Sequence, residues 1–95
     1  APPVVNADDI LNDPEGVLKK LCAACGIPFD AAMLSWQAGP KPFDGVWAPH
    51  WYNAVWKSTG LTRQEPKQIE LPGALQKIAD AARPLYEKMK PYRLT

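Results

Sequence analysis

The sequence predicts a mainly α-helical protein with four or five helices and a short extended N-terminal segment. Apolar residues recur at helical spacing in two long stretches, residues 14–25 and 72–89. The 11 prolines are roughly twice as frequent as the usual 5% or so, and they stand mostly between or at the starts of the helical patterns. Alternating strand patterns are almost absent. A chain of 95 residues forms one domain at most, so we treat residues 1–95 as a single helical segment.

The N-terminal residues predict an extended lead-in followed by one helical turn. Val4 and Val5 come after two prolines and are typical of the end of a short strand. A run of two residues cannot form a sheet by itself. Residues 6–11 then predict a helical turn, with Ile10 and Leu11 facing inward.

The clearest helix in the sequence spans residues 14–25. Asp13 is a good N-cap, Pro14 suits the first helical position, and Gly26 suits the position that ends the helix. The residues that form one apolar stripe at helical spacing are Val17, Leu18, Leu21, Cys22 and Cys25.

Cys22 and Cys25 form a CxxC pattern, which is compatible with a redox pair or with half of a zinc site. A zinc site needs two more ligands, and the chain offers only His50 and carboxylates. A redox CxxC normally opens a helix, whereas this one ends a helix. We therefore interpret both cysteines as buried, reduced core thiols and expect no metal site.

The middle of the chain predicts two helices separated by a loop. Asp30 suits the cap of a short helix that reaches Trp36, and residues 37–45 are a loop by composition. A further helix is expected from about Pro49 to Ser58, with Trp51 on its inner face as a core anchor. Residues 61–70 are polar and loop-like.

The last helix is expected to begin near Pro72. Its apolar positions at helical spacing are Leu75, Ile78, Ala79, Ala82, Leu85, Tyr86 and Met89. Pro84 interrupts this pattern and removes the hydrogen bond to residue 80. Because the pattern continues past Pro84, we expect a kinked helix at this point.

Residues 44–60 hold three of the four tryptophans and the single histidine. His50 is the weak candidate for a general base, because histidine titrates near neutral pH. The alternative is a structural histidine that fixes loop 37–48 against the helix. Trp47, His50 and Trp51 are the candidate substrate-binding residues, since tryptophan stacks on planar or apolar ligands. Trp47 is the best placed to line a cleft, whereas Trp51 suits the core.

Charge and hydropathy exclude several classes of protein. Eleven basic residues nearly balance ten acidic ones, so we expect no nucleic-acid partner. No apolar run approaches the ~20 residues that span a bilayer, and no leader-like segment is present. We expect no membrane partner and a cytoplasmic location.

Two blocks of sequence carry a family resemblance. Residues 4–34, VVNADDILNDPEGVLKKLCAACGIPFDAAML, resemble the stretch near the C-terminal end of P-loop sulfotransferases. Residues 36–60, with GVWAPHWY and STG, resemble the bacterial and plant sulfotransferase-like branch, some members of which carry an aminotransferase-like label. The final ARPLYEKMKPYRL is similar to the terminal helix of that branch.

The resemblance implies the C-terminal part of an α/β P-loop fold. The complete protein would be a transferase that moves a sulfuryl group from 3′-phosphoadenylyl sulfate to a small-molecule acceptor. The chain would pack on an N-terminal P-loop part of the same protein and form part of the acceptor pocket. It begins at Ala1 rather than at methionine, and we expect a longer polypeptide.

The phosphate-binding cradle of the family has no counterpart in these residues. A cradle needs small residues that open a helix and direct several N–H groups at the anion. Prolines remove donors after Gly39, and residues 58–60 end a helix rather than open one. We therefore expect no cofactor-binding residue here and no activity of the chain alone. The alternatives are a free-standing helical interaction module that uses its tryptophan-rich face, and a degenerate family member with a structural role.

Overall fold

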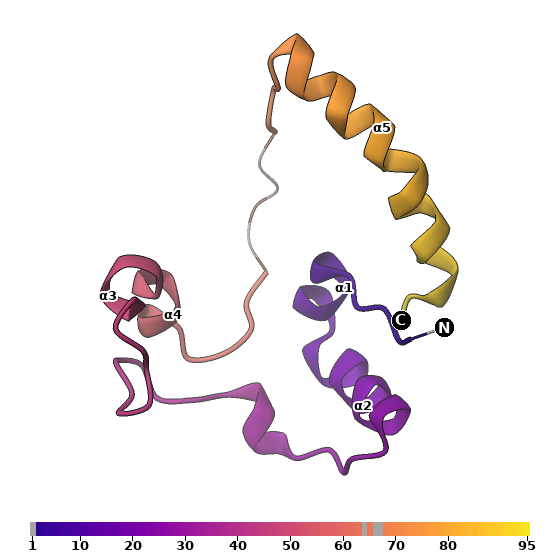
Figure 1. Cartoon of the computed structure of the whole chain (residues 1–95). Coiled ribbons are helices and arrows are strands. Elements are labelled where there is room, and N and C mark those ends of the chain that lie inside the picture. Colours follow the sequence, from indigo (N-terminus) through magenta and orange to yellow (C-terminus); the bar gives the residue numbers. More distant parts are fainter. Residues whose placement is uncertain (1, 64, 66–67) are drawn as a thin grey trace.

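The computed structural model describes residues 2–63, 65 and 68–95 and confirms the mainly α prediction (Figure 1). Helices connected by long extended segments make up the chain, and no sheet forms within the described residues. In chain order the elements are α1 (Ala7–Asn12), α2 (Pro14–Cys25), the 3-10 helix η1 (Ala31–Leu34), α3 (Ala48–Trp51), α4 (Asn53–Lys57), α5 (Gly73–Met89) and the 3-10 helix η2 (Lys90–Tyr92).

Side-chain caps begin both N-terminal helices, and the cap at Asp13 is as predicted. The Asn6 side chain accepts a hydrogen bond from the Asp8 N–H at the start of α1 (2.9 Å). The Asp13 carboxylate accepts one from the Gly16 N–H at the start of α2 (3.1 Å). Gly26 ends α2 at φ 70°, a left-handed conformation that glycine adopts without a steric penalty. These caps satisfy backbone groups that a helix end leaves without partners.

One face of α2 provides most of the core. Val17 and Cys22 are buried, and the Cys22 thiol lies 3.9 Å from the Met33 sulfur on η1. Cys25 is exposed, so the prediction that both cysteines are buried is wrong for this residue. Cys25 lies in the last turn of α2, where the chain reverses at Gly26 and no other helix covers it among the described residues.

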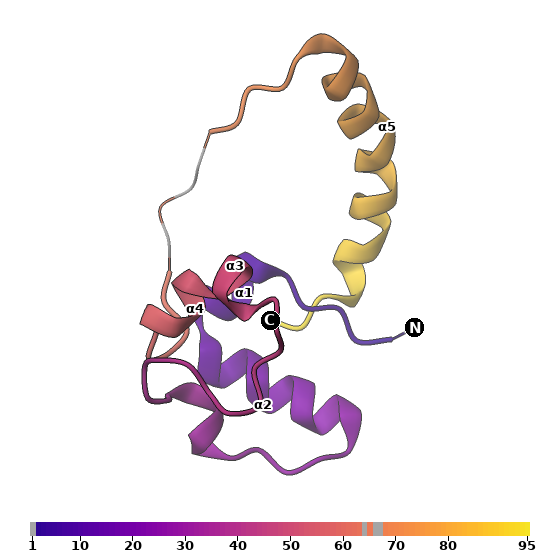
Figure 2. The same ribbon diagram turned by 60° about the vertical axis from the view of Figure 1, so that its left-hand side comes forward.

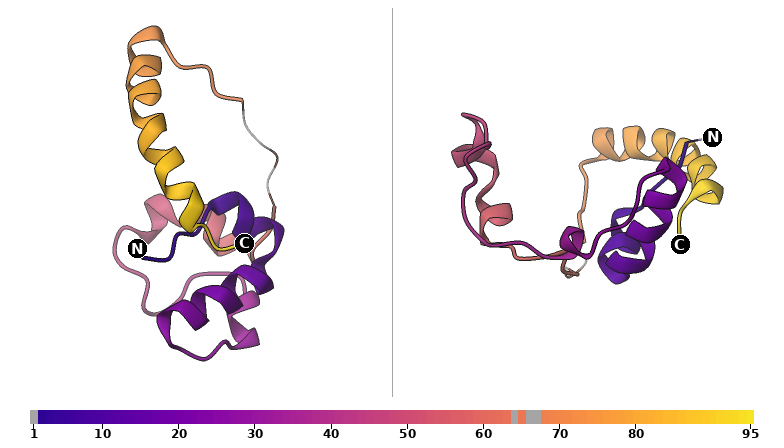
Figure 3. Two further views of the ribbon diagram at one scale, coloured as in Figure 1. Left: turned by 90° about the vertical axis from the view of Figure 1, so that its right-hand side faces the viewer. Right: turned by 90° about the horizontal axis from the view of Figure 1, so that it is seen from below.

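The two ends of the chain meet. The Val4 N–H donates to the Tyr92 carbonyl (3.4 Å), and the Val4 carbonyl accepts from the Leu94 N–H (2.9 Å), which forms a parallel bridge between Val4 and Arg93. The two termini lie close together in Figures 1 and 3. Nothing local in the sequence predicts this pairing, because the paired residues are almost the whole chain apart.

Side chains reinforce this meeting of the ends. The Arg93 guanidinium lies 3.1 Å from the Asp9 carboxylate of α1, and the Lys20 ammonium on α2 donates to the Thr95 carbonyl. The Asn6 amide donates to the Tyr86 hydroxyl of α5 (2.7 Å). These contacts hold the residues after α5 against α1 and α2, and join Tyr86 of α5 to Asn6, which precedes α1.

The helix expected from about Pro49 to Ser58 is divided into α3 and α4. The division falls at Tyr52, whose ψ of 13° lies outside the helical range. Tyr52 still makes two backbone hydrogen bonds. Its N–H donates to the Ala48 carbonyl, and its carbonyl accepts from the Trp56 N–H (2.8 Å each). The segment is rich in Trp, Tyr, Asn and Val, which have low helix propensity, and no side chain caps it.

Helix α5 runs without a break through Pro84, and Figure 1 shows it as a curved ribbon rather than as two helices joined at a sharp angle. None of its described residues is buried. Five apolar residues expected on its inner face have exposed fractions of 49% to 66%: Leu75, Ile78, Leu85, Tyr86 and Met89. The helix therefore forms as predicted, but the described residues leave its apolar face largely uncovered.

The parts of the chain are spread out rather than gathered around one core. The radius of gyration is 16.6 Å, against about 12 Å for a compact domain of this length. Figure 2 shows α5 standing away from α3 and α4. The predicted loop at residues 61–70 has no regular structure where it is described, and its residues 64, 66 and 67 lie outside the described part.

Candidate functional site

The aromatic segment from residue 35 to residue 60 is held together by its own backbone. The Trp36 N–H donates to the Thr59 carbonyl (2.9 Å), and the Gly39 N–H donates to the Trp56 carbonyl (2.7 Å). An antiparallel bridge joins Ser35 to residue 60 beside them. The stretch before loop 37–45 therefore lies against the stretch that ends α4, and the loop projects from this pairing.

Two of the four tryptophans use their indole N–H groups to hold this arrangement. Trp36 donates to the Ser58 hydroxyl (3.0 Å), which in turn donates to the Val55 carbonyl (2.6 Å). Trp56 donates to the Asp44 carboxylate (2.9 Å). Both indoles are partly covered, as expected for aromatic residues whose polar group has a partner. Trp36 and Trp56 are thus structural residues of the segment.

Asp44 connects the loop to α4. The same oxygen that binds Trp56 accepts a hydrogen bond from the Lys41 N–H (2.8 Å). The bond from this backbone N–H, followed by the one from the indole, lowers the pKa of Asp44 below its ordinary 3.8, because both stabilise the carboxylate form. The Lys41 ammonium donates to the Gln37 carbonyl (2.6 Å) and closes the loop on itself.

The other two tryptophans are exposed. Trp47 is 68% and Trp51 74% exposed, so the prediction of Trp51 as a core anchor is wrong. The reason is that α3 has only four residues and, among the described elements, makes contact with α4 alone. Ala48 of α3 is buried, but within the described part of the chain no helix other than α4 contacts α3, and Trp51 stays uncovered. Phe43 and Val46 next to it are exposed to 85% and 87%.

His50 lies beside Trp47, with ring centroids 6.1 Å apart and the rings inclined at 56°. Its imidazole is exposed and makes no hydrogen bond or ion pair with the described residues. Among the described residues, no hydrogen bond or ion pair therefore joins the imidazole to loop 37–48. The structure thus brings Trp47, the N-cap residue of α3, next to His50 on that helix, and Trp51 follows His50 along the chain. We call Trp47, His50 and Trp51 the aromatic surface.

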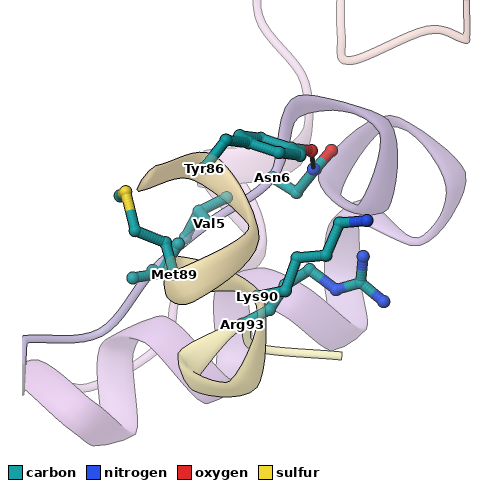
Figure 4. A pocket seen from close by; sticks show the side chains of 7 residues that line it. Val5, Asn6, Tyr86, Met89, Lys90 and Arg93 are labelled. Atoms are coloured by element: carbon teal, nitrogen blue, oxygen red, sulfur yellow. Dashed lines mark hydrogen bonds between the residues drawn. The ribbon is translucent and has the colours of Figure 1, made fainter. Parts of the chain in front are cut away.

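A small cavity lies at the other end of the molecule, where the chain ends meet. It holds about 100 Å³ and is lined by Val4, Val5, Asn6, Tyr86, Met89, Lys90 and Arg93 (Figure 4). Its two cationic side chains already have acidic partners, since Lys90 lies 3.0 Å from Glu87 and Arg93 pairs with Asp9. Sequence reasoning missed this cavity because it is formed only when residues 4–6 and 86–93 come together.

Within the described residues, no group of three or more histidine, cysteine, aspartate or glutamate side chains is arranged to hold a metal ion. Among the same residues, no helix has both the length and the apolar character that a bilayer crossing requires.

Comparison with known proteins identifies relatives over almost the whole chain. A family model described as a sulfotransferase domain matches residues 2–93. Branched-chain-amino-acid aminotransferase-like protein 1 of Arabidopsis thaliana is 42% identical over 89 residues, and protein 2 of the same plant is 39% identical over 89 residues. In each case the match covers 94% of this chain and 16% of the relative. This chain therefore spans about a sixth of the length of these relatives. No solved structure matches it.

Proposed function

Because this chain belongs to the sulfotransferase domain family, we propose that it is the C-terminal helical portion of a sulfotransferase-like protein. In this proposal it packs on a P-loop core supplied by the rest of that protein and forms one wall of the acceptor pocket. The complete protein transfers a sulfuryl group from 3′-phosphoadenylyl sulfate to a hydroxyl or amine of a small molecule in the cytoplasm. The chain by itself is inactive.

The unpartnered apolar surface of the chain carries this proposal. Burial of apolar side chains is the main favourable term in folding, at about 25 cal/mol per Å². Here Val17, Cys22 and Ala48 are the buried hydrophobic residues of the described part, whereas the apolar face of α5 and the aromatic surface stay open to solvent. A monomer rarely exposes so much apolar surface unless another protein surface covers it. A core outside this chain would provide that cover.

The aromatic surface suits one wall of an acceptor pocket. Loop 37–45 and α4 are fixed by the Asp44 and Ser58 hydrogen bonds, so α3 projects from a braced support. Trp47 supplies a flat apolar face for the acceptor, and His50 supplies a base beside it. As the acceptor oxygen bonds to sulfur, its proton passes to His50, and the nucleotide phosphate leaves with the electrons of the broken bond.

A second candidate is a helical interaction module that uses the same exposed tryptophans to bind a peptide or another subunit. The exposure of Trp47 and Trp51 supports this function as well. The two candidates differ in what covers these residues. In the first, the rest of the same polypeptide shields at least one of them, whereas in the second both stay open until the partner binds. A third candidate is a degenerate family member with a structural role, which would pack on the core without turnover.

The test uses the complete protein with 3′-phosphoadenylyl sulfate and a panel of hydroxyl and amine acceptors. We expect transfer by the complete protein and none by the 95-residue chain. His50→Ala and His50→Gln should both lower kcat, because neither residue accepts a proton at neutral pH. Trp47→Ala should raise KM for the acceptor. Lys57→Ala, an exposed change on α4, is the matched control and should leave both constants unchanged.

The outcomes separate the candidates. No transfer to any acceptor, together with acrylamide quenching of Trp47 and Trp51 in the complete protein, would favour the interaction module. No transfer with both tryptophans shielded would favour the structural role. Full turnover by both His50 variants would remove His50 as the base and leave the acceptor wall to the tryptophans.

A further inference from the structure

The cavity between the two chain ends has an apolar side and a polar side. Met89 and Val5 lie on one side of it, and the charged ends of Lys90 and Arg93 lie on the other (Figure 4). The hydroxyl of Tyr86 points to the polar side as well. A cavity divided in this way suits a ligand with an apolar body and one polar end.

The polar side chains of the cavity offer donors rather than acceptors. The Asn6 side-chain oxygen already accepts from the Asp8 N–H (2.9 Å). The Tyr86 hydroxyl oxygen accepts from the Asn6 amide (2.7 Å), so its own proton remains to be donated. The cations of Lys90 and Arg93 donate only. The polar end of a fitting ligand therefore accepts hydrogen bonds and carries negative charge, as a carboxylate does.

The acidic partners of the two cations leave most of this donor capacity in place. Lys90 and Glu87 are 43% and 46% exposed, and an ion pair in such a position stabilises little. Arg93 faces Asp9 through Nε (3.1 Å), which leaves its two terminal nitrogens for a ligand. The Lys90 ammonium lies 5.6 Å from the centre of the Tyr86 ring, so it stays beside the phenol. None of the seven described lining residues is acidic.

The size of the cavity limits the apolar body. Its volume is about 100 Å³. An apolar cavity of about 150 Å³ in another protein holds one benzene molecule. The body that fits here is therefore smaller than a benzene ring, about three to five carbon atoms.

We propose that this cavity binds a short-chain aliphatic carboxylate. The carboxylate accepts hydrogen bonds from Lys90, Arg93 and the Tyr86 hydroxyl. Its aliphatic body lies against Val5 and Met89. The site goes beyond the proposed sulfuryl transfer, because neither the aromatic surface nor the acceptor takes part in it. Since the lining comes from both ends of the chain, the bound carboxylate also strengthens their meeting.

Titration of the complete protein with isobutyrate and isobutyramide tests the proposal. The two probes have nearly the same shape, but only isobutyrate is charged at neutral pH. With methionine methyl groups labelled with ¹³C, we expect isobutyrate to shift the Met89 signal and to bind on the order of tenfold more tightly than isobutyramide. Met89→Leu assigns this signal by its loss. Equal affinities for the two probes, or a Met89 signal that isobutyrate does not move, would overturn the proposal.

Substitutions on the two sides of the cavity provide an independent measurement. Met89→Trp fills the cavity, and Lys90→Gln removes a charge. We expect each to weaken isobutyrate binding on the order of tenfold by calorimetry. Lys88→Gln is the matched control, because Lys88 is an exposed cation of the same helix outside the lining. Lys90 is exposed, so Lys90→Gln decides the question even if Met89→Trp does not fold. Unchanged affinity in Lys90→Gln would contradict the proposal.

Inorganic sulfate and phosphate show whether the apolar body matters. Both anions lack such a body, so we expect them to bind more weakly than isobutyrate. Binding as tight as that of isobutyrate would overturn the proposal. These readouts are separate from turnover: a protein that transfers no sulfuryl group but binds isobutyrate beside Met89 would lose the proposed activity and keep this site.

Discussion

Helices α2 and α5 both carry apolar residues at helical spacing but have different surroundings. In α2, a side-chain cap begins the helix, a left-handed glycine ends it, and Val17 and Cys22 on its stripe are buried. In α5, no side chain caps the first turn, a proline stands in the interior, and none of the described residues is buried. The same 3.6-residue period therefore leads to a core in one region and to an open surface in the other.

The difference shows what an amphipathic pattern does and does not specify. The stripe of α2 is covered by α1 and η1, which come directly before and after it in the chain. Helix α5 contacts only η2 among the described elements, and its stripe remains open. A pattern predicts which face of a helix will be buried, whereas the partner that buries it depends on segments that can lie anywhere in the protein.

The largest expected effect separates the two faces directly. Val17→Asp places a charge at a position that is 2% exposed, and an uncompensated buried charge costs about 3–5 kcal/mol. Ile78→Asp places the same charge at a position that is 66% exposed and should change the free energy of unfolding by no more than about 0.5 kcal/mol. Urea unfolding of the 95-residue chain measures both.

The same pair of variants in the complete protein sharpens the comparison. If a core covers α5 there, Ile78→Asp should become as damaging as Val17→Asp. A mild effect of Ile78→Asp in both proteins would show that the α5 stripe faces solvent in the complete protein as well.

Pro84→Ala is expected to have the next largest effect. Proline in a helix interior removes one hydrogen bond and costs about 3 kcal/mol, so alanine should stabilise α5 by up to that amount. Circular dichroism should show higher helical content and a higher midpoint of thermal loss. Pro28→Ala, outside any helix, is the matched control. An unchanged signal would mean that residues around Pro84 do not limit the helix.

Loss of the α2 cap should have a smaller effect. Asp13→Ala removes the acceptor for the Gly16 N–H and should lower the free energy of unfolding by about 1 kcal/mol. Asp13→Asn retains a good N-cap and should cost much less. Chemical denaturation with a helical readout compares the two, and equal losses would show that charge rather than capping matters at this position.

The smallest effect concerns pH and the aromatic segment. Because the pKa of Asp44 is lowered in the folded chain, its carboxylate stabilises the fold above the ordinary value of 3.8. This contribution is lost as the pH falls through the lowered folded pKa. Tryptophan fluorescence during acid titration should report the release of Trp56, and Asp44→Asn should remove that transition. If the transition persists in Asp44→Asn, a group other than Asp44 causes it. Asp80→Asn is the control.

The predictable parts of the fold are those that depend on residues close together in the chain. The caps at Asp13 and Asp30, the end of α2 at Gly26 and the extent of α5 all depend on hydrogen bonds over a few residues. The prediction for the helix at 49–58 missed its division at Tyr52, where low helix propensity acts without a cap to oppose it.

The candidate site was predictable only in part. His50 and Trp51 lie on α3, Trp47 is the N-cap residue of that helix, and Trp47 and His50 are neighbours in space. The sequence did not separate the exposed tryptophans from the bonded ones, because that distinction depends on Ser58 and Asp44 reaching the indoles of Trp36 and Trp56. The signal that could have been sought is a polar acceptor, such as Ser58 or Asp44, within reach of an indole N–H once the loop closes.

The sequence by itself determined helices α2 and α5, the caps at Asp13 and Asp30, and the family, since each depends on local patterns or on matched motifs. The tertiary structure alone decided that Val4 pairs with the C-terminal segment, that Cys25 and Trp51 remain exposed, and that the stripe of α5 is uncovered. The physical reason is that backbone capping acts over a few residues. Burial, in contrast, depends on surfaces that come from distant parts of the sequence.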